Sequence, residues 1–414
     1  MNPDPVDAAA LAFFRLPEGQ RLLNMASESA DTAGLLRLQQ QLRAEFPPAI
    51  CRAALATVEL RLHAREKFSQ ASQMYFDREG LEMATREEVA NYRATRFAGC
   101  DSVVDLCCGI GGDTVALATH SRVIAVDTAP LRLEMARMNA VALGIDADRI
   151  VFVRADADGF LARADAAFID PARRRDGRRV RAAEAYSPPL SSLEQLRRTI
   201  PLVVVKLAPG IRDSDLPADA EVEFISSARQ CREALVSFPP LAPSLARSPV
   251  RSPVRARRIA TVLPGPHCLA ETLPASPPAA VEAPGAYMHD PDAAVVRAGL
   301  VDRLATHLDA WRVDARSAYL TSDGGTPSPF AQVFRVMWEM PFNLKSLKQK
   351  LSLQGLRAEE IKKRHFPIEP DDLRRLLRVK GKSESNHGAG RPITLILTQI
   401  AQRPHAFVCE RVRV

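Results

Sequence analysis

The spacing of apolar residues changes along the chain and predicts three regions. In residues 6–97 apolar positions recur every three or four residues, as in Leu55, Val58 and Leu62. This repeat places the apolar side chains on one face of an α-helix. We therefore expect an N-terminal helical region over residues 1–97.

Residues 98–266 instead alternate short β-branched runs with helical stretches. The runs read SVVDL, RVIAVD, RIVFVRAD, AAFIDP, PLVVVKLAP and CREALVSF, and ARRIATVLPG at 256–265 is a candidate seventh strand. Strands that alternate with helices predict an α/β fold, in which a parallel sheet is joined by crossover helices. Residues 245–256, rich in Pro, Ser and Arg, are predicted to form a solvated insertion.

The third region, residues 287–414, is predicted to be a separate α+β domain that follows a Pro- and Ala-rich linker at 267–286. Asp290 followed by Pro291 matches the start of a helix, with the aspartate as N-cap. VFRVMWEM alternates like a strand, NLKSLKQKLSLQGL is an amphipathic helix, and PITLILTQI and HAFVCERVRV are candidate closing strands.

Composition narrows the class of protein. The 414 residues carry 56 Lys and Arg against 49 Asp and Glu, and the net charge of +7 favours an anionic partner. Seven cysteines without a CxxC pair give no metal-binding pattern and fit reduced thiols in a cytoplasmic protein. There is neither a basic signal segment nor a run of 18 apolar residues, so no membrane partner is expected.

The candidate chemistry begins at residues 103–114, VVDLCCGIGGDT, where an apolar strand runs into a glycine-rich turn. Such a turn lets the backbone approach a ligand closely. A G-x-G-x-x-G dinucleotide fingerprint would require glycine at position 114, which is Thr114. Asp105 would repel a diphosphate but would suit a ligand with ammonium and sulfonium groups, which is S-adenosylmethionine.

Two further carboxylates follow at the ends of the next two strands. Asp127 ends RVIAVD, where an acid accepts hydrogen bonds from ribose hydroxyls. Asp156 follows the third strand and is expected to receive the adenine amino group. The predicted cofactor site therefore consists of Asp105, Cys107, Gly109, Gly111, Gly112, Asp127 and Asp156.

The stretch from DLCCGIGGDT to VALGI resembles the core of class I methyltransferases. It is most similar to the trimethylguanosine synthase group, whose loop has the form C-G-x-G-G, and FDREGLEMATREEVANYRATRF is also similar to that group. HDPDAAVVRAGL, IKKRHFP and LILTQI resemble the THUMP-like domain of bacterial methyltransferases. The resemblance implies a Rossmann-like seven-stranded sheet that binds S-adenosylmethionine, a C-terminal THUMP-like domain and an RNA partner.

The fourth predicted strand ends in AAFIDPARRR, where class I methyltransferases bind the methyl acceptor. Enzymes that methylate exocyclic amines carry [D/N/S]-P-P-aromatic there. Asp170 and Pro171 match this pattern, whereas Ala172 and Arg173 depart from it. Because a guanidinium is planar, Arg173 can still stack on a base, and an exocyclic amine remains the favoured acceptor.

Two basic clusters are candidate phosphate contacts. Six arginines between 173 and 181 follow the acceptor strand, and residues 341–382 hold twelve bases against five acids, a difference of +7. Arginine and lysine at such positions bind phosphates. The predicted substrate contacts are Arg173, Arg174, Arg175, Lys362, Lys363 and Arg364.

Lys206 offers a different acceptor chemistry. Together with Asp170, Glu233 and Lys67 it would form a Lys-Asp-Lys-Glu set, with which ribose 2′-O-methyltransferases deprotonate a hydroxyl. The predicted catalytic residues are thus Asp170, Pro171 and Lys206, and neither route requires a metal. The sequence predicts a methyltransferase for RNA; a small-molecule or protein methyltransferase and a non-catalytic RNA-binding protein are the alternatives.

Overall fold

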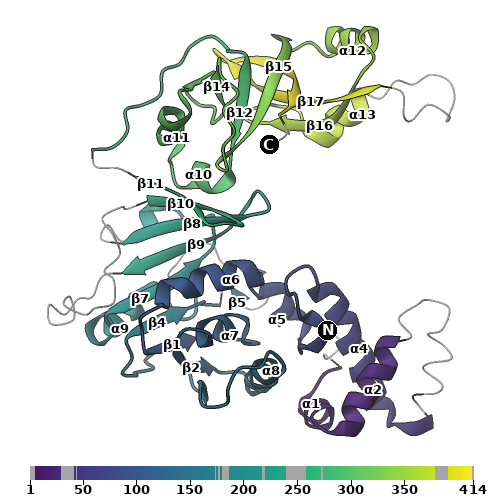
Figure 1. Ribbon diagram of the computed structural model, residues 1–414, viewed down its shortest axis with the longest axis vertical. Helices are drawn as coiled ribbons and strands as arrows, with labels where there is room; N and C mark the ends of the chain where they lie inside the picture. Colours follow the sequence, from purple (N-terminus) through teal and green to yellow (C-terminus); the bar gives the residue numbers. More distant parts are fainter. Residues whose placement is uncertain are drawn as a thin grey trace. The chain divides into compact units, whose positions relative to one another are not determined.

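The computed structural model is drawn in Figure 1. It describes residues 5–28, 42, 44–172, 174–175, 178–179, 186–216, 220–238, 258–271, 274–377 and 390–412. Two compact units divide the chain: unit 1 comprises Met1–Glu221 and Glu233–Arg255, and unit 2 comprises Val222–Arg232 and Ala256–Val414. The insertion predicted at 245–256 lies outside the described residues.

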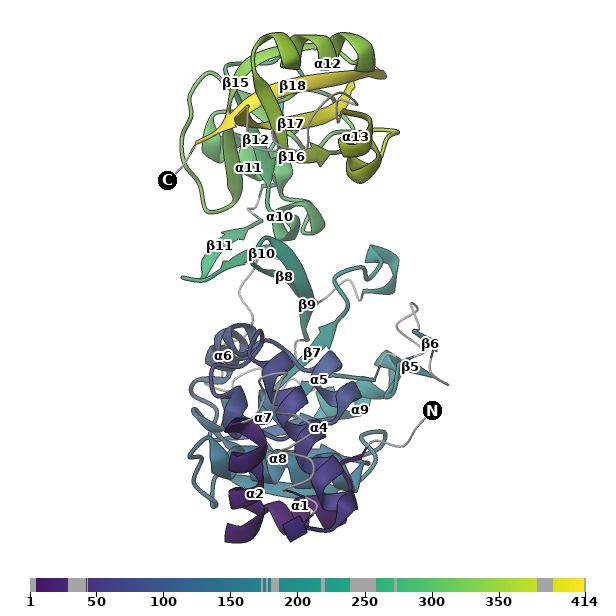
Figure 2. The same cartoon turned by 90° about the vertical axis from the view of Figure 1, so that its right-hand side faces the viewer.

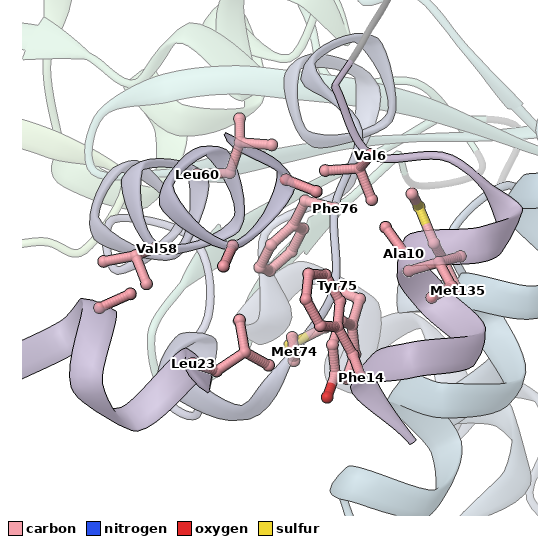
Figure 3. Packing of buried hydrophobic residues seen from close by; sticks show 14 of the residues in the cluster. Val6, Ala10, Phe14, Leu23, Val58, Leu60, Met74, Tyr75, Phe76 and Met135 are labelled. Carbon is pink, nitrogen blue, oxygen red and sulfur yellow. The ribbon is translucent and has the colours of Figure 1, made fainter. Parts of the chain in front are cut away.

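Unit 1 begins with the predicted helices. They are α1 (Ala8–Phe14), α2 (Pro17–Glu28), α4 (Pro48–Ala64), α5 (Arg78–Met83) and α6 (Glu87–Ala94), with 3₁₀ turns η1 (Ala71–Gln73) and η2 (Thr95–Phe97). Figure 3 shows their buried core, in which Phe14, Val58 and Phe76 lie with Met135 of α8 (Pro130–Ala142). The N-terminal helices therefore pack against α8 of the same unit through shared apolar side chains.

The sheet of unit 1 is built from buried β-branched strands. It contains β1 (Ser102–Leu106), β2 (Arg122–Asp127), β3 (Ile150–Arg154), β4 (Ala166–Ile169), β7 (Leu202–Leu207) and β9 (Gln230–Phe238), with helices α7 (Gly112–Ala118), α8 and α9 (Leu193–Thr199) between them. All neighbours are parallel except β9, which runs antiparallel to β7. Every residue of β4 and β7 is buried, as expected for central strands of a parallel sheet.

The complete strand order of this sheet is β3-β2-β1-β4-β7-β9-β8-β10-β11. Seven strands were predicted, and β10 (Arg258–Leu263), the expected seventh, is a strand. The prediction missed β8 (Glu221–Ser227) and β11 (His267–Ala270). β8 reads EVEFISS and is buried at every position. Its two glutamates interrupt the apolar pattern, so the strand was not predicted.

Unit 2 holds the predicted α+β domain. Its second sheet has the order β13-β14-β12-β15-β18-β17-β16 and is antiparallel except for β16 beside β17. The strands are β12 (Tyr287–Pro291), β13 (Trp311–Arg312), β14 (Leu320–Ser322), β15 (Ala331–Pro341), β16 (Leu356–Lys363), β17 (Arg391–Ile400) and β18 (Arg403–Arg411). The helices are α10 (Ala293–Arg297), α11 (Val301–Leu308), α12 (Leu344–Leu353) and α13 (Pro370–Leu377). Figure 2 shows α12 and α13 beside β16.

Two local predictions differ from the structure of unit 2. Asp292, not Asp290, is the N-cap of α10 and accepts a hydrogen bond from the Ala294 amide at 2.9 Å. Asp290 and Pro291 instead end β12. The predicted linker at 267–286 contains β11, which pairs with β10. The domain limits at 97, 266 and 286 stay predictions.

None of the described helices combines the length and the apolar character that a membrane span requires.

The core beneath α12 gives a test of unit 2. Leu347 is fully buried, whereas Leu353 of the same helix is 79% exposed. Replacing Leu347 with Ala should therefore lower the free energy of unfolding by about 2–5 kcal/mol. Leu353→Ala should change it by about 0.5 kcal/mol or less.

The measurement is urea unfolding followed by tryptophan fluorescence. The two tryptophans, Trp311 and Trp338, both belong to unit 2, so the signal reports that unit alone. Equal effects of the two substitutions would contradict the placement of α12.

Candidate active site

The glycine-rich turn joins β1 to α7 in a backbone conformation that few residues tolerate. Cys107, Gly109 and Gly111 have φ of +65°, +55° and +83°. Glycine is required at 111, since a Cβ there would lie 2.8 Å from the Cβ of Ala136 in α8. Asn139 of α8 donates a hydrogen bond to the Ile110 carbonyl at 2.9 Å and fixes the turn against that helix.

A cavity of about 200 Å³ opens at this turn, at the carboxyl ends of the strands. Four carboxylates line it: Asp113, Asp127, Asp156 and Asp170. Arg132 also lines it, but its guanidinium is paired with Asp77 and Glu79 at 3.0 and 2.7 Å. The cavity is therefore electronegative, which favours a cationic ligand and disfavours a diphosphate.

The carboxylates that were predicted to bind ribose and adenine are held in place by the backbone. Asp127 accepts hydrogen bonds from the amides of Gly109 and Ala129 at 2.8 and 2.9 Å. Asp156 accepts one from the amide of Asp158 at 2.9 Å. Each oxygen has a further lone pair, so these contacts orient the carboxylates and leave acceptor capacity for a ligand.

Asp105 does not occupy the place that the sequence suggested. Its side chain is 1% exposed and does not line the cavity. Thr114, in the first turn of α7, donates a hydrogen bond to its Oδ2 at 2.5 Å, and its Oδ1 has no partner among the described residues. Burial raises the pKa of Asp105 to about 7, against the opposing effect of the Thr114 hydrogen bond. Asp105 thus holds the first turn of α7 in place through Thr114, on the buried side of the glycine-rich turn.

The glycine-rich turn also holds two adjacent cysteines, Cys107 and Cys108. Both line the cavity, and Cys107 lies against the Ser187 carbonyl, with Sγ 3.8 Å from the oxygen. Burial raises the pKa of both thiols above the ordinary value, so neither is a thiolate at neutral pH. Among the described residues no group of His, Cys, Asp and Glu could hold a metal ion.

Arg93 is the residue of the site that the sequence did not reveal. It lies on α6, is 2% exposed, and its guanidinium bridges Asp113 and Glu233 of β9 while stacking 4.4 Å from the centroid of Phe168 in β4. Burial opposes the charge of Arg93, but the two carboxylates outweigh it and raise its pKa. Its only sequence signal is a position in the stretch EVANYRATRF that resembles methyltransferase extensions.

Thr85 connects Arg93 to Lys206 and, through Lys206, to Asp170. Its hydroxyl donates to Asp113 at 3.0 Å and accepts from Arg93 at 3.3 Å and from Lys206 at 2.8 Å. Lys206 also forms an ion pair with Asp170. Although burial acts to raise the pKa of Asp113, Arg93 and Lys206 lower it. In Glu233 burial prevails over Arg93 and raises the pKa.

The predicted Lys-Asp-Lys-Glu set is assembled only in part. Lys206, Asp170 and Glu233 belong to the same network, but Lys67 does not. Lys67 donates to the carbonyls at the end of α5, those of Leu81, Glu82 and Ala84, at 2.7–2.9 Å. Arg93 supplies the second cation of the network instead. Pro171 is buried directly after Asp170.

The predicted substrate arginines follow the acceptor strand. Arg174 and Arg175 form a short strand, β5, that pairs with β6 (Arg178–Arg179). Arg173 lies outside the described residues. Ala172 pairs with Ser187, and both residues line the cavity.

Lys362, Lys363 and Arg364, predicted to contact RNA, form ion pairs within unit 2. Lys362 and Arg364 both bind Asp290, at 3.0 and 2.9 Å, and Lys363 binds Glu369 at 2.6 Å. Asp290 is 8% exposed, so these bonds attach the end of β16 to β12. The charges of these three residues are thus compensated within unit 2, and their contact with RNA stays a prediction.

Comparisons with known proteins agree with this geometry. The chain is 36% identical over 346 residues to an uncharacterized S-adenosylmethionine-dependent methyltransferase of Mycobacterium tuberculosis, with 82% of this chain and 89% of the relative covered; the two strains compared match equally. The chain belongs to the class I S-adenosylmethionine-dependent methyltransferases. A structure named as a methyltransferase from Porphyromonas gingivalis has a TM-score of 0.73 at 20% identity, covering 95% of this chain and 99% of that one.

Three segments of this methyltransferase match described families. Residues 100–172 match RNA cap guanine-N2 methyltransferase, and residues 331–411 match THUMP domain-like. Residues 7–64 match a domain of unknown function. The chain is therefore an enzyme that uses S-adenosylmethionine, and its THUMP-like domain is C-terminal. The alternative of a non-catalytic RNA-binding protein is set aside.

The residues of the cavity fit this cofactor. Four carboxylates line the cavity, those of Asp113, Asp127, Asp156 and Asp170, and the network behind them supplies two cations, Arg93 and Lys206. A cationic ligand reduces this excess of negative charge. When bound, S-adenosylmethionine supplies a methyl group on a positively charged sulfur. Asp127 and Asp156 both line the cavity, and their hydrogen bonds to the cofactor stay a prediction.

The titration of Asp105 gives a test of its burial. Between the pKa of an ordinary aspartate, about 4, and its folded value near 7, the folded protein retains a proton that the unfolded chain releases. The contribution of Asp105 to stability should therefore fall by up to about 1.4 kcal/mol per pH unit over that window. Asp105→Asn, which stays neutral, should remove this loss.

The measurement is the difference in melting temperature between wild type and Asp105→Asn from pH 5 to pH 8. The variant should gain on the wild type as pH rises. Asp101→Asn is the control, since Asp101 is exposed at the other end of β1. A difference that does not depend on pH would show that Asp105 is ionised throughout.

Proposed function

We propose that this methyltransferase modifies RNA at an exocyclic amine of a base. The observation that carries the proposal is the position of Asp170, which lines the same cavity as Asp127 and Asp156. The match to RNA cap guanine-N2 methyltransferase over residues 100–172 ends at Ala172 and includes all three residues. Asp170 would accept the N–H of the acceptor amine and leave the nitrogen lone pair directed at the methyl group.

The Asp170–Lys206 pair supports an amine more than a ribose hydroxyl. Lys206 is 5% exposed, is absent from the cavity lining, and donates to both Asp170 and Thr85. A lysine that serves as general base must reach the hydroxyl with an unprotonated amine. Lys206 lies behind the carboxylate and would instead hold Asp170 in place, through their ion pair, as an acceptor of hydrogen bonds.

The acceptor would be aligned, not activated by strong base. Methyl transfer is an in-line displacement on an already cationic donor, so positioning contributes about 7–11 kcal/mol to lowering the barrier. Ala172, Ser187 and Pro188 line the cavity beside Asp170 and limit where a base can enter. Cys107 would exclude water beside Ser187, whose carbonyl lies 3.8 Å from its Sγ.

We further propose that α12 of the THUMP-like domain contributes to RNA docking. Lys345 is exposed, and Lys350 lies 3.9 Å from the centroid of the Trp338 ring. Among the described residues no carboxylate forms an ion pair with either lysine. Their charge would face RNA phosphates, whereas the charge of IKKR is already matched by acids.

The acceptor proposal is tested with RNA from a strain that lacks the enzyme. Purified protein and S-adenosylmethionine should restore one methylated nucleoside, detected by mass spectrometry. Asp170→Ala should abolish this product while cofactor affinity, measured by calorimetry, stays within about threefold. Asp127→Ala should instead weaken cofactor binding by about tenfold or more, since a charged acceptor of ribose hydrogen bonds is lost.

Melting temperatures of both variants show whether the fold is kept. A product from Asp170→Ala at the wild-type rate would contradict its role as acceptor contact. Methylated ribose in place of a methylated base would overturn the amine assignment.

The docking proposal is tested by Lys345→Ala with Lys350→Ala. Loss of two phosphate contacts should weaken binding of single-stranded RNA and lower the slope of log K against log salt by about 1.4. Fluorescence anisotropy at several salt concentrations measures this slope. Arg374→Ala with Arg375→Ala is the matched control, since both arginines are paired with Asp371 and Asp372 on α13. Equal changes in both pairs would contradict docking on α12.

A further inference from the structure

A second cavity in unit 1 lies between the N-terminal helices and α8 and has a volume of about 480 Å³. Its lining residues come from α1, α2, α4, the segment around η1, and α8. It shares none of its described lining residues with the active-site cavity. Volumes of 300–1,000 Å³ are typical of small-molecule sites.

Arg61 of α4 brings a buried positive charge to this cavity. The residue is 9% exposed, and its guanidinium donates to the carbonyls of Met74 at 2.9 Å and Gln73 at 3.4 Å. No described carboxylate pairs with it. Burial lowers the pKa of Arg61, and the Tyr75 phenol is the group that partly offsets this effect. A buried charge without a counter-charge is costly, so its environment favours an anionic ligand.

Two further arginines stand on the rim of the cavity. Arg15 and Arg137 share the single carboxylate of Glu134, with N–O distances of 3.0 and 3.7 Å. Their side chains are 60% and 51% exposed. Three arginines against one glutamate leave the described lining with an excess of two positive charges.

The walls that carry these charges are fixed by packing. Tyr75 stacks on Phe14 with ring centroids 6.4 Å apart, and Figure 3 shows the two rings side by side in the helical core. Gln20 donates to the Tyr75 hydroxyl at 2.9 Å, and the Arg61 guanidinium lies 5.0 Å from the Tyr75 ring centroid. The anchor charge is therefore preorganised, since it needs no rearrangement before it binds a ligand.

We propose that this cavity binds a phosphate group, with Arg61 as the buried anchor and Arg15 and Arg137 as the outer contacts. The planar fork of arginine matches the oxygens of phosphate and can bind two of them at once. The phosphate has two chemical sources: the backbone of an RNA chain, or a free nucleotide or other small phosphate ester. The proposal does not rest on the identity of the methyl acceptor.

The first arm of the experiment uses inorganic pyrophosphate and calorimetry on the full chain. Arg61→Met should lower the affinity about tenfold or more, and Arg61→Lys should recover part of it. Because Arg61 also binds two carbonyls, a second variant avoids the core: Arg15→Gln with Arg137→Gln should lower the affinity about fivefold or more. The control is Arg52→Gln with Arg65→Gln, which removes two exposed charges at and beside α4 but outside the cavity.

The second arm measures anisotropy of a fluorescent oligouridylate with the same proteins. If the source is RNA, the Arg15/Arg137 variant should bind it more weakly and the salt slope should fall by about 1.4, with the control unchanged. If only pyrophosphate binding is affected, the source is a free phosphate compound.

Indistinguishable behaviour of the cavity variants and the control with both probes would overturn the phosphate site. So would failure of both probes to bind the wild type. Neither result depends on the methylation assay, so the phosphate site and the proposed methyl acceptor can fail separately.

Discussion

The buried guanidinium of Arg93 is the constraint on which the rest of the active site depends. Asp113 and Glu233 are acids at 12% and 2% side-chain exposure, and burying them without a cation would be strongly unfavourable. Arg93 satisfies both and lies on the face of Phe168. Arg93 of α6 thereby joins the start of α7, the antiparallel strand β9 and the central strand β4. The segment that contains α6 is for this reason held against the sheet of unit 1.

The same network explains how a site rich in carboxylates remains stable. Lys206 compensates Asp170, and Thr85 transmits the contact to Asp113 through its hydroxyl. In this network Asp113 and Asp170 line the cavity, whereas Arg93 and Lys206 do not. A ligand that approaches therefore meets negative charge, although the nearest positive charges are buried only one layer deeper.

Much of the architecture could be predicted from local pattern. β4 is a continuous apolar run, and β7 is interrupted only by Lys206. The glycines at 109 and 111 fit the positive φ that the turn requires. β8 was missed because Glu221 and Glu223 break its apolar pattern; in the structure they bind Arg96 and Thr261. Partners so distant in sequence cannot be deduced from periodicity.

The site was predicted in the same uneven way. Asp127, Asp156 and Asp170 line the cavity, since each lies at or within two residues of the carboxyl end of a strand of the parallel sheet. Asp105 also ends a strand, but its side chain points into the interior. Arg93 and Thr85 lie on the extension, where no motif marks them. The charges of Lys362, Lys363 and Arg364 were read as available, but their acids, Asp290 and Glu369, are partners that only the fold brings near.

The discontinuous course of the chain has a consequence for dissecting this protein. The chain enters unit 2 at Val222, returns to unit 1 at Glu233 and enters unit 2 again at Ala256. The first of these segments of unit 2 contains β8 from Val222 onward, and the second contains β10, its parallel neighbour. A protein ended before residue 256 would retain β8, buried along its whole length in the intact chain, with one hydrogen-bonding edge bare. The bare edge would allow two copies of the fragment to pair. Unit 1 is therefore best studied in the full chain.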